Sequence, residues 1–589
     1  MLNLLNENTL LPLMVFLPLL GGLAMLLLPI RGAGSVRAYA LLNTVLTFAA
    51  ALGATAAFRW TGAGATMQMS SRITWIEPFG LSFSFGVDAI SLWLVLLTTF
   101  LMPLVVLGSF SAVKDRHREF YVWLLVLEAA MIGTFVATDV IFFYICFEFT
   151  LIPLYFLIGV FGSTQRLKAA RVFFLYTFTG SMLTFTGVLY VAWWFASGND
   201  GVWSFLIPDL VDAAQQMDPS AQMCVLLALL AGFAVKVPLF PLHTWLPLAH
   251  TEAPTAGSVI LAGVLLKLGT YGLLRFALPM CPAAVVEAAP AIGVLAVIGI
   301  LYTALICWVQ QDIKKLIAYS SVSHLGFCVL GMFSLNALGV GGSVMYMINH
   351  GLSTGALFLC VGMIYERFHT RQMKQMGGLA RVMPRWAFFM VFFCLSSVGL
   401  PGLNGFVGEF LTLLGTFQSQ DVLGIGYAVP AGFGMIFAAI YLLYMVGRVV
   451  FGPVCIPRDP AGHERPAPES KSDLPAPQVK DLNLREVATL VPLAVACLWL
   501  GLAPNTVLST LKDPIETLTA APRREVAKRN ANGIPLQTMT SRVRPTEVTS
   551  RASTNDPTEQ PPEPVYPFVS HRRADNAPEI RDAFTLANQ

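Results

Sequence analysis

Two lysines lie inside apolar stretches of this sequence. Lys236 and Lys267 belong to a run from residue 224 to 267 that otherwise reads as membrane-spanning. A charge at the centre of a membrane helix costs roughly 2.5 to 3.5 kcal/mol, so each lysine requires buried partners or water. Pro238, Pro241 and Pro247 follow Lys236 and interrupt the helix, which lipid tolerates only inside protein or beside a water-filled cavity. These residues therefore predict a polar interior.

Glu148 provides a carboxylate at a similar depth. It follows Asp139 by nine residues, or ~14 Å of helix, which places it near mid-membrane. Opposite charge and similar depth predict that Glu148 and Lys236 form a pair, whose charges change when a proton moves. The alternative is a static ion pair that only fixes helix packing.

Lys267 and two histidines extend this pattern. Lys267 lies about a dozen residues, or ~18 Å, into its span, which is farther than a lysine stem can reach to the interface. His324 and His350 fall inside the spans 312–334 and 340–367. One such histidine is ordinarily a hydrogen-bonded core residue. Two of them beside intramembrane lysines and glutamates indicate a proton relay, and no pair of histidines has spacing typical of a metal or haem site.

The last candidate is Glu409, which follows an interruption at Pro401 in the span 385–419. A proline-interrupted span in each half, each with a charge, is the signature of inverted transporter repeats. The sequence predicts two such repeats of five helices each, at residues 119–280 and 281–452.

Composition places these residues in a membrane protein. The chain has 589 residues, of which 56% are hydrophobic and 12% charged. This favours an all-α polytopic membrane protein with about 14 transmembrane helices, of which the seventh and twelfth are broken. The net charge of +3 favours no nucleic-acid partner, and the nine cysteines follow neither an iron–sulfur nor a disulfide pattern. The predicted spans are 10–30, 36–58, 88–112, 119–137, 139–160, 166–196, 221–248, 254–278, 286–309, 312–334, 340–367, 385–419, 424–451 and 487–510.

Charge and polarity divide the rest of the chain. Residues 1–118 hold three helices and a hairpin, predicted from alternating apolar and polar residues between the second and third spans. Basic residues fall in alternate connections, which predicts that both termini lie outside, on the periplasmic face. The charged, proline-rich residues 453–486 form a cytoplasmic loop before helix 487–510. The polar residues 511–589 are expected to be a tail that is disordered or bound to a partner.

The run from Lys236 to Thr255, with the interrupted span at Pro401, resembles the antiporter-like membrane subunits of respiratory complex I. Members of this family carry a glutamate in the fifth span, lysines in the seventh and eighth, and an ionisable residue in the twelfth. Glu409 and the segment QDIKKLIAYSSVSHLG (311–326) are similar to the M-type members, also called mitochondrial subunit 4, because the sister subunits L and N carry lysine at the position of Glu409.

The resemblance implies a proton-translocating subunit of NADH:quinone oxidoreductase in a bacterial inner membrane. Subunits L and N are the implied partners, together with the bilayer. Electron transfer from NADH to quinone would occur in other subunits, which would hold the flavin and iron–sulfur clusters, so no cofactor or metal is expected in this chain. Glu148 and Lys236 would form a modulating pair, Lys267 would pass the proton on through His324 and His350, and Glu409 would release it.

Three alternatives remain at this stage. A subunit of an Mrp-type cation/proton antiporter or of a membrane-bound hydrogenase has related sequence features. A quinone-binding redox enzyme and a passive membrane scaffold belong to other classes of protein.

Overall fold

The computed structural model describes residues 7–29, 32–62, 64–456 and 479–533. Within these residues the protein is almost entirely helical, with one hairpin of two antiparallel strands, β1 (Gln68–Ile76) and β2 (Leu81–Val87), between the second and third helices. The helices are α1 (Glu7–Leu27), α2 (Ala33–Ala57), α3 (Ala89–Gly108), α4 (His117–Val136), α5 (Val140–Phe149), α6 (Leu151–Phe161), α7 (Arg166–Gly198), α8 (Ile207–Gln215), α9 (Pro219–Lys236), α10 (Trp245–Glu252), α11 (Thr255–Ile260), α12 (Leu266–Gly272), α13 (Leu278–Met280), α14 (Pro282–Val309), α15 (Ile313–Phe333), α16 (Ala337–Phe368), α17 (Pro384–Val398), α18 (Asn404–Gln418), α19 (Ile425–Val449), α20 (Leu484–Leu502) and α21 (Asn505–Ala531).

Thirteen of the described helical stretches are long and apolar enough to cross a membrane, so the chain is a multi-pass membrane protein. The predicted span 385–419 is not among the 13, because it consists of two helices of 15 residues each, α17 and α18. Helix α17 ends at Gly399, whose φ of 82° is left-handed, and α18 begins at Asn404. Helix α9 ends at Lys236, and the next helix, α10, begins at Trp245.

Side-chain caps fix where several helices begin. Asp88, Asp139, Asp218 and Asp312 each accept hydrogen bonds from backbone N–H groups in the first turn of α3, α5, α9 and α15. These bonds satisfy donors that have no partner inside the helix. The polar residues at the predicted span boundaries thus act as start signals.

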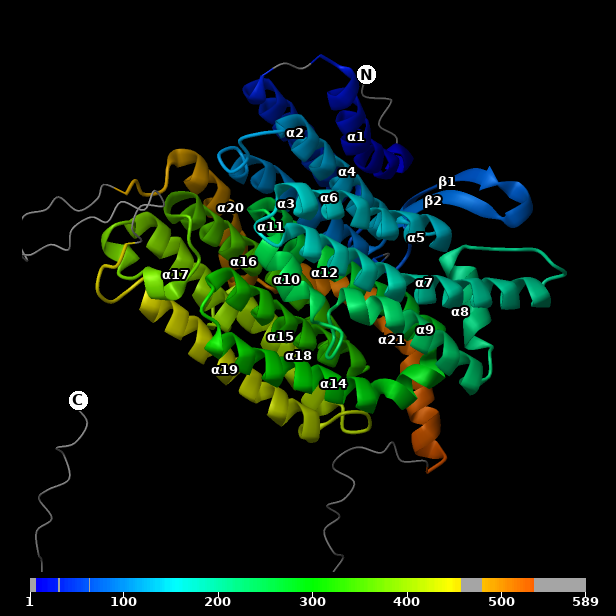
Figure 1. Ribbon diagram of the computed structural model, residues 1–589. Helices are drawn as coiled ribbons and strands as arrows, with labels where there is room; N and C mark the ends of the chain where they lie inside the picture. Colours follow the sequence, from blue (N-terminus) through cyan, green and yellow to red (C-terminus); the bar gives the residue numbers. More distant parts are fainter. Residues whose placement is uncertain (1–6, 30–31, 63, 457–478, 534–589) are drawn as a thin grey trace, which may run out of the picture. The chain divides into compact units, whose positions relative to one another are not determined.

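The spans differ widely in how deeply they are buried. The stretches Thr255–Met280, Ile313–Phe333 and Ala337–Phe368 are buried almost throughout, whereas α1, α2 and α7 expose many apolar side chains, as expected of helices that face lipid. In Figure 1, α15, α16 and α18 lie close together in the interior of the bundle, and these helices contact one another. The interior spans carry Lys267, His324 and His350.

The C-terminal region differs from the sequence prediction. The last span ends at Leu502 rather than 510, and residues Asn505–Ala531 form α21. This helix packs against α3, α13, α14 and α16, and Thr510 accepts a hydrogen bond from Trp93 Nε1 at 2.9 Å. The start of the predicted tail is therefore an ordered helix on the bundle, while residues 534–589 and most of the predicted loop 453–486 lie outside the described residues.

Candidate functional site

Lys267 lies at the centre of the buried polar network. It is fully buried and follows a π-helical segment, Leu261–Leu265. Its Nζ donates a hydrogen bond to the carbonyl of Ala262 and lies 2.6 Å from Nδ1 of His350. A π-helical turn is wider than an α-helical turn and is frequent at functional sites. Here it precedes the lysine that joins this helix to α16.

The network continues from His350 to Glu409. The rings of His350 and His324 are 5.7 Å apart between centroids. His324 Nδ1 lies 2.5 Å from the hydroxyl of Tyr346, and that hydroxyl donates to Oε1 of Glu409. When the hydroxyl proton of Tyr346 is directed at Glu409, its oxygen is free to accept a hydrogen bond from His324 Nδ1. Residues from α12, α16, α15 and α18 thus form one chain of titratable or proton-donating groups.

Close helix contact holds Glu409 in place. Asn404, at the start of α18, donates to the carbonyl of Asn349 (3.2 Å), and Asn349 donates to the carbonyl of Asn404 (2.6 Å). Gly408 lies against Tyr346, where an added Cβ would be 2.7 Å from the Cβ of that tyrosine. The gap between α17 and α18 therefore allows a carboxylate to be placed directly against α16.

Glu148 and Lys236 are arranged differently. Lys236 is 4% exposed, and its Nζ donates to Phe147 O and Thr150 Oγ1, both at 3.2 Å. The same ammonium lies 3.8 Å from the centroid of the Phe147 ring. The two lysine acceptors thus flank Glu148 in sequence. Among the described residues no salt bridge joins Glu148 to Lys236, and they interact only through their electrostatic field.

Comparison with known proteins identifies the family. Residues 137–434 match the family model described as NADH:quinone oxidoreductase/Mrp antiporter, TM, and residues 40–134 match that of NADH-ubiquinone oxidoreductase chain 4, amino terminus. The chain is 42% identical over 511 residues to NADH-quinone oxidoreductase subunit M of Rhodobacter capsulatus, covering 85% of this chain and 94% of that relative. It is 40% identical over 509 residues to NADH-ubiquinone oxidoreductase chain 4 of Marchantia polymorpha, covering 86% and 96% respectively.

The chain belongs to the antiporter-like membrane subunits of NADH:quinone oxidoreductase, of the subunit M and chain 4 type.

Solved structures agree with this family. A chain of respiratory complex I from Thermus thermophilus with bound NADH is similar with a TM-score of 0.74 and 29% identity, over 87% of this chain and 99% of that one. A chain of the Mrp complex from Dietzia sp. has a TM-score of 0.73 over 88% and 99% of the two chains, but at 21% identity it shows only a common fold.

In this antiporter-like subunit, the network that begins at Lys267 and the pair Glu148–Lys236 come close to each other at Gly269. A Cβ at Gly269 would lie 2.8 Å from Val237 Cγ2 and 3.0 Å from Lys236 Cβ. Helix α12, which carries Lys267, therefore packs directly on the end of α9. No described hydrogen bond connects Lys236 with Lys267, so the two groups are adjacent but not bonded.

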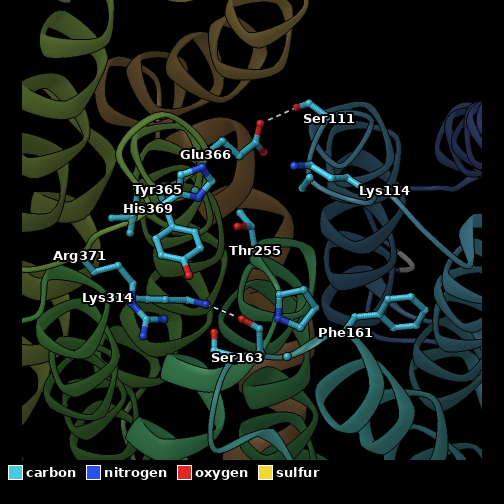
Figure 2. Close-up of a pocket in the computed structure, with 16 residues that line it drawn as sticks. Ser111, Lys114, Phe161, Ser163, Thr255, Lys314, Tyr365, Glu366, His369 and Arg371 are labelled. Carbon is cyan, nitrogen blue, oxygen red and sulfur yellow. Dashed lines mark hydrogen bonds between the residues drawn. The ribbon is translucent and has the colours of Figure 1, made fainter. Parts of the chain in front are cut away.

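A pocket of about 440 Å³ opens at the end of the bundle where α11 begins. Figure 2 shows the side chain of Lys314 extending to a backbone oxygen, that of Ala253, and Glu366 hydrogen-bonded to Ser111 farther up in the view. Lys314 is 6% exposed, and its Nζ donates to the carbonyl of Ala253 at 2.5 Å.

His250 lies between this pocket and Lys267. His250 is fully buried, stacks on Phe358 with centroids 4.7 Å apart, and has no hydrogen-bond partner among the described residues for either ring nitrogen. Burial lowers the pKa of His250 well below its usual value, and the nearby Lys314 and Lys267 lower it further.

Tyr346 is the group that sequence reasoning missed. A tyrosine in an apolar helix is usually a packing residue, so its type gave no signal. Its spacing did, because Tyr346 precedes His350 by four residues and so lies on the same face of α16.

Proposed function

We propose that this subunit translocates protons through Lys267, His350, His324, Tyr346 and Glu409, with the Glu148–Lys236 pair modulating the route. Electron transfer from NADH to quinone in other subunits would drive the process. The observation that supports this proposal best is the buried chain of polar groups from Lys267 to Glu409, which crosses from α12 to α18.

The chemistry of each group suits the transfer of a proton. The ammonium of Lys267 lies against an imidazole nitrogen, and an imidazole can take up a proton at one nitrogen while it releases another. Tyr346 can pass a proton from His324 to Glu409, because its hydroxyl can release its own proton to Glu409 while it accepts one from His324. In an interior without competing water, such bonds polarise one another.

The pocket at Lys314 supports uptake at one face. Lys314, His250 and Lys267 follow one another from the pocket inward, and His250 interacts electrostatically with both lysines. A neutral histidine between two lysines can accept a proton from the first and donate it to the second. In the proposed orientation this face is cytoplasmic and both chain termini are periplasmic.

The proposed architecture explains why two interruptions occur. Residues 119–280 and 281–452 would form two inverted repeats of five helices, with broken seventh and twelfth spans that carry Lys236 and Glu409. In transporters built in this way, broken helices place charges near the membrane centre. The sister subunits L and N would lie beside this one in a bacterial inner membrane, while flavin and iron–sulfur clusters would belong to other subunits.

The test is proton transport by the assembled complex in reconstituted vesicles. Removing a positioned proton-transfer group typically costs ~10²-fold or more, so we expect Glu409→Gln to lower pumping by about that factor. Glu409→Asp should retain part of it, because the step needs a titratable group. Glu409→Lys should also retain some activity.

Glu287 offers a matched control. Its side chain is 59% exposed and lies 3.5 Å from Arg529 Nη2, on the surface of α14. Glu287→Gln should pump as well as the native complex at equal assembly. If Glu409→Gln pumps as well as this control, Glu409 is a structural residue and the proposed route is wrong.

A further inference from the structure

A second buried polar cluster lies on the same helical run as Lys267, beyond it from the pocket. Arg275 Nη2 donates to Asp88 Oδ2 at 2.7 Å, with only 9% and 2% of the two side chains exposed. Arg275 also donates to Tyr271 Oη at 3.2 Å and to Ser91 Oγ at 3.1 Å. The hydroxyls of Ser91 and Tyr271 lie 2.8 Å apart. The proposed relay uses none of these four residues.

The remaining acceptor and hydroxyl groups of the cluster form hydrogen bonds within the protein. The other oxygen of Asp88 accepts the backbone N–H of Ser91 at 2.8 Å, as the cap of α3. Tyr271 donates to the carbonyl of Phe135 on α4 at 3.3 Å. None of the oxygens of Asp88, Ser91 and Tyr271 is a buried atom without a partner. The carboxylate and hydroxyl oxygens of the cluster are thus all engaged, and a buried network whose acceptors are engaged holds its members rigidly.

Its position follows from the helix that carries it. The helical run starts at Thr255, which lines the pocket, and passes Lys267 before it reaches Tyr271 and Arg275. Tyr271 and Arg275 follow Lys267 by four and eight residues, so the guanidinium is roughly 12 Å farther along the helix. The cluster therefore lies between Lys267 and the membrane face opposite the pocket.

The chemistry of arginine suits a barrier better than a relay. A guanidinium remains protonated at every physiological pH, so it cannot accept a proton and pass it on. A fixed positive charge in a narrow region repels protons, as in channels that conduct water but exclude cations. Stability alone is a weak reason for such a pair, because well-packed apolar residues often replace a buried ion pair without loss.

We propose that Asp88, Arg275, Tyr271 and Ser91 form a seal that prevents protons on Lys267 from passing directly to the opposite face. The proposal rests on the proposed function of Lys267 as a proton carrier. With the seal in place, a proton on Lys267 would leave toward the opposite face by the lateral connection through His350 to Glu409. A subunit without the seal would conduct protons passively and would waste the gradient.

The test measures passive proton flux, without NADH, in vesicles that contain the assembled complex under an imposed potential. The double variant Asp88→Asn/Arg275→Gln removes both charges but keeps groups that can bond to each other. We expect its passive flux to rise at least about fivefold. Adding Lys267→Met should abolish the increase, because the leak passes through that lysine.

A matched control is available at another bundle position. Arg367 and Glu486 form a similar partly buried pair between α16 and α20, with 2.7 Å between Nη2 and Oε2. Arg367→Gln/Glu486→Gln should leave the passive flux unchanged. If the double variant at Asp88 and Arg275 prevents assembly, Arg275→Gln alone provides the same measurement.

Three outcomes would overturn the seal. They are unchanged flux in an assembled variant at Arg275, an equal leak in the Arg367 control, and a leak that persists without Lys267. Each is independent of the pumping measured with Glu409→Gln, so failure of the seal and failure of the proposed function can be distinguished.

Discussion

The two groups of buried charges in this subunit differ in how their members are connected. From Lys267 to Glu409, neighbouring groups lie in hydrogen-bond contact except at the step between the two histidine rings. Glu148 and Lys236 share no hydrogen bond, and Lys236 is instead held by the residues on either side of Glu148. The first arrangement supports transfer of a proton along bonds, whereas the second acts through charge at a distance.

This difference suggests different responses to mutation. A group in a series of bonds is needed for every proton that passes, so removing any one of them should block the same step. A pair that acts through its field responds to net charge, so a second mutation can compensate for the first. The following predictions use this contrast.

After Glu409→Gln, the largest effect is expected in the same bonded series, at Tyr346. Tyr346→Phe removes the hydroxyl between His324 and Glu409, which is worth about 1 to 1.5 kcal/mol, and should slow pumping about tenfold. Combining it with Glu409→Gln should be no worse than Glu409→Gln alone. Tyr121 is also buried, and its hydroxyl accepts a hydrogen bond from Ser109 at 3.1 Å, outside the Lys267–Glu409 network. Tyr121→Phe is therefore the control and should pump normally. Equal rates for the two variants would remove Tyr346 from the route.

A smaller effect is expected at the pair. Lys236→Ala leaves Glu148 as a buried charge without its counterpart, and Glu148→Ala does the same to Lys236. Each should reduce pumping about fivefold, equivalent to about 1 kcal/mol, while the complex assembles. The double variant should lose only about twofold, since the net charge is restored. Strictly additive losses in vesicle assays would contradict action through the field.

The orientation of the subunit can be tested without loss of activity. Cys455 is exposed in the connection after α19, which is cytoplasmic in the proposed orientation. In a variant without Cys224, an impermeant maleimide should label Asn3→Cys in intact cells but should reach Cys455 only after permeabilisation. The opposite labelling would reverse the orientation and place the pocket at Lys314 on the outer face.

Much of the fold could be predicted because each membrane span appears in the sequence as a long apolar run. The 13 described spans and the hairpin follow the predicted ranges to within a few residues, apart from the seventh span, which ends at Lys236 rather than 248, and the last span. Helix α21 was not predicted because its residues are on average as polar as those of an unstructured tail. The helix packs against α16 and α14, and these contacts stabilise it. Such tertiary contacts are not visible in local composition.

The candidate residues were predictable where a charge contradicts its surroundings. Lys267 and Glu409 stand out because ionisable residues are rare in membrane spans. Tyr346 and Arg275 did not stand out, the first because tyrosine is common in apolar helices and the second because it lies near the end of a span. Only the structure shows that Arg275 is buried against Asp88.

Gly269 has a mechanical consequence for how the two groups of charges communicate. Where it meets Val237 and Lys236, α12 has no side chain of its own, and a Cβ there would lie 2.9 Å from the backbone nitrogen of Val237. A side chain can change rotamer and absorb a small displacement, but a contact close to the backbone cannot. If Glu148 and Lys236 change charge as proposed, a shift of the end of α9 would therefore reach the helix of Lys267 with little damping.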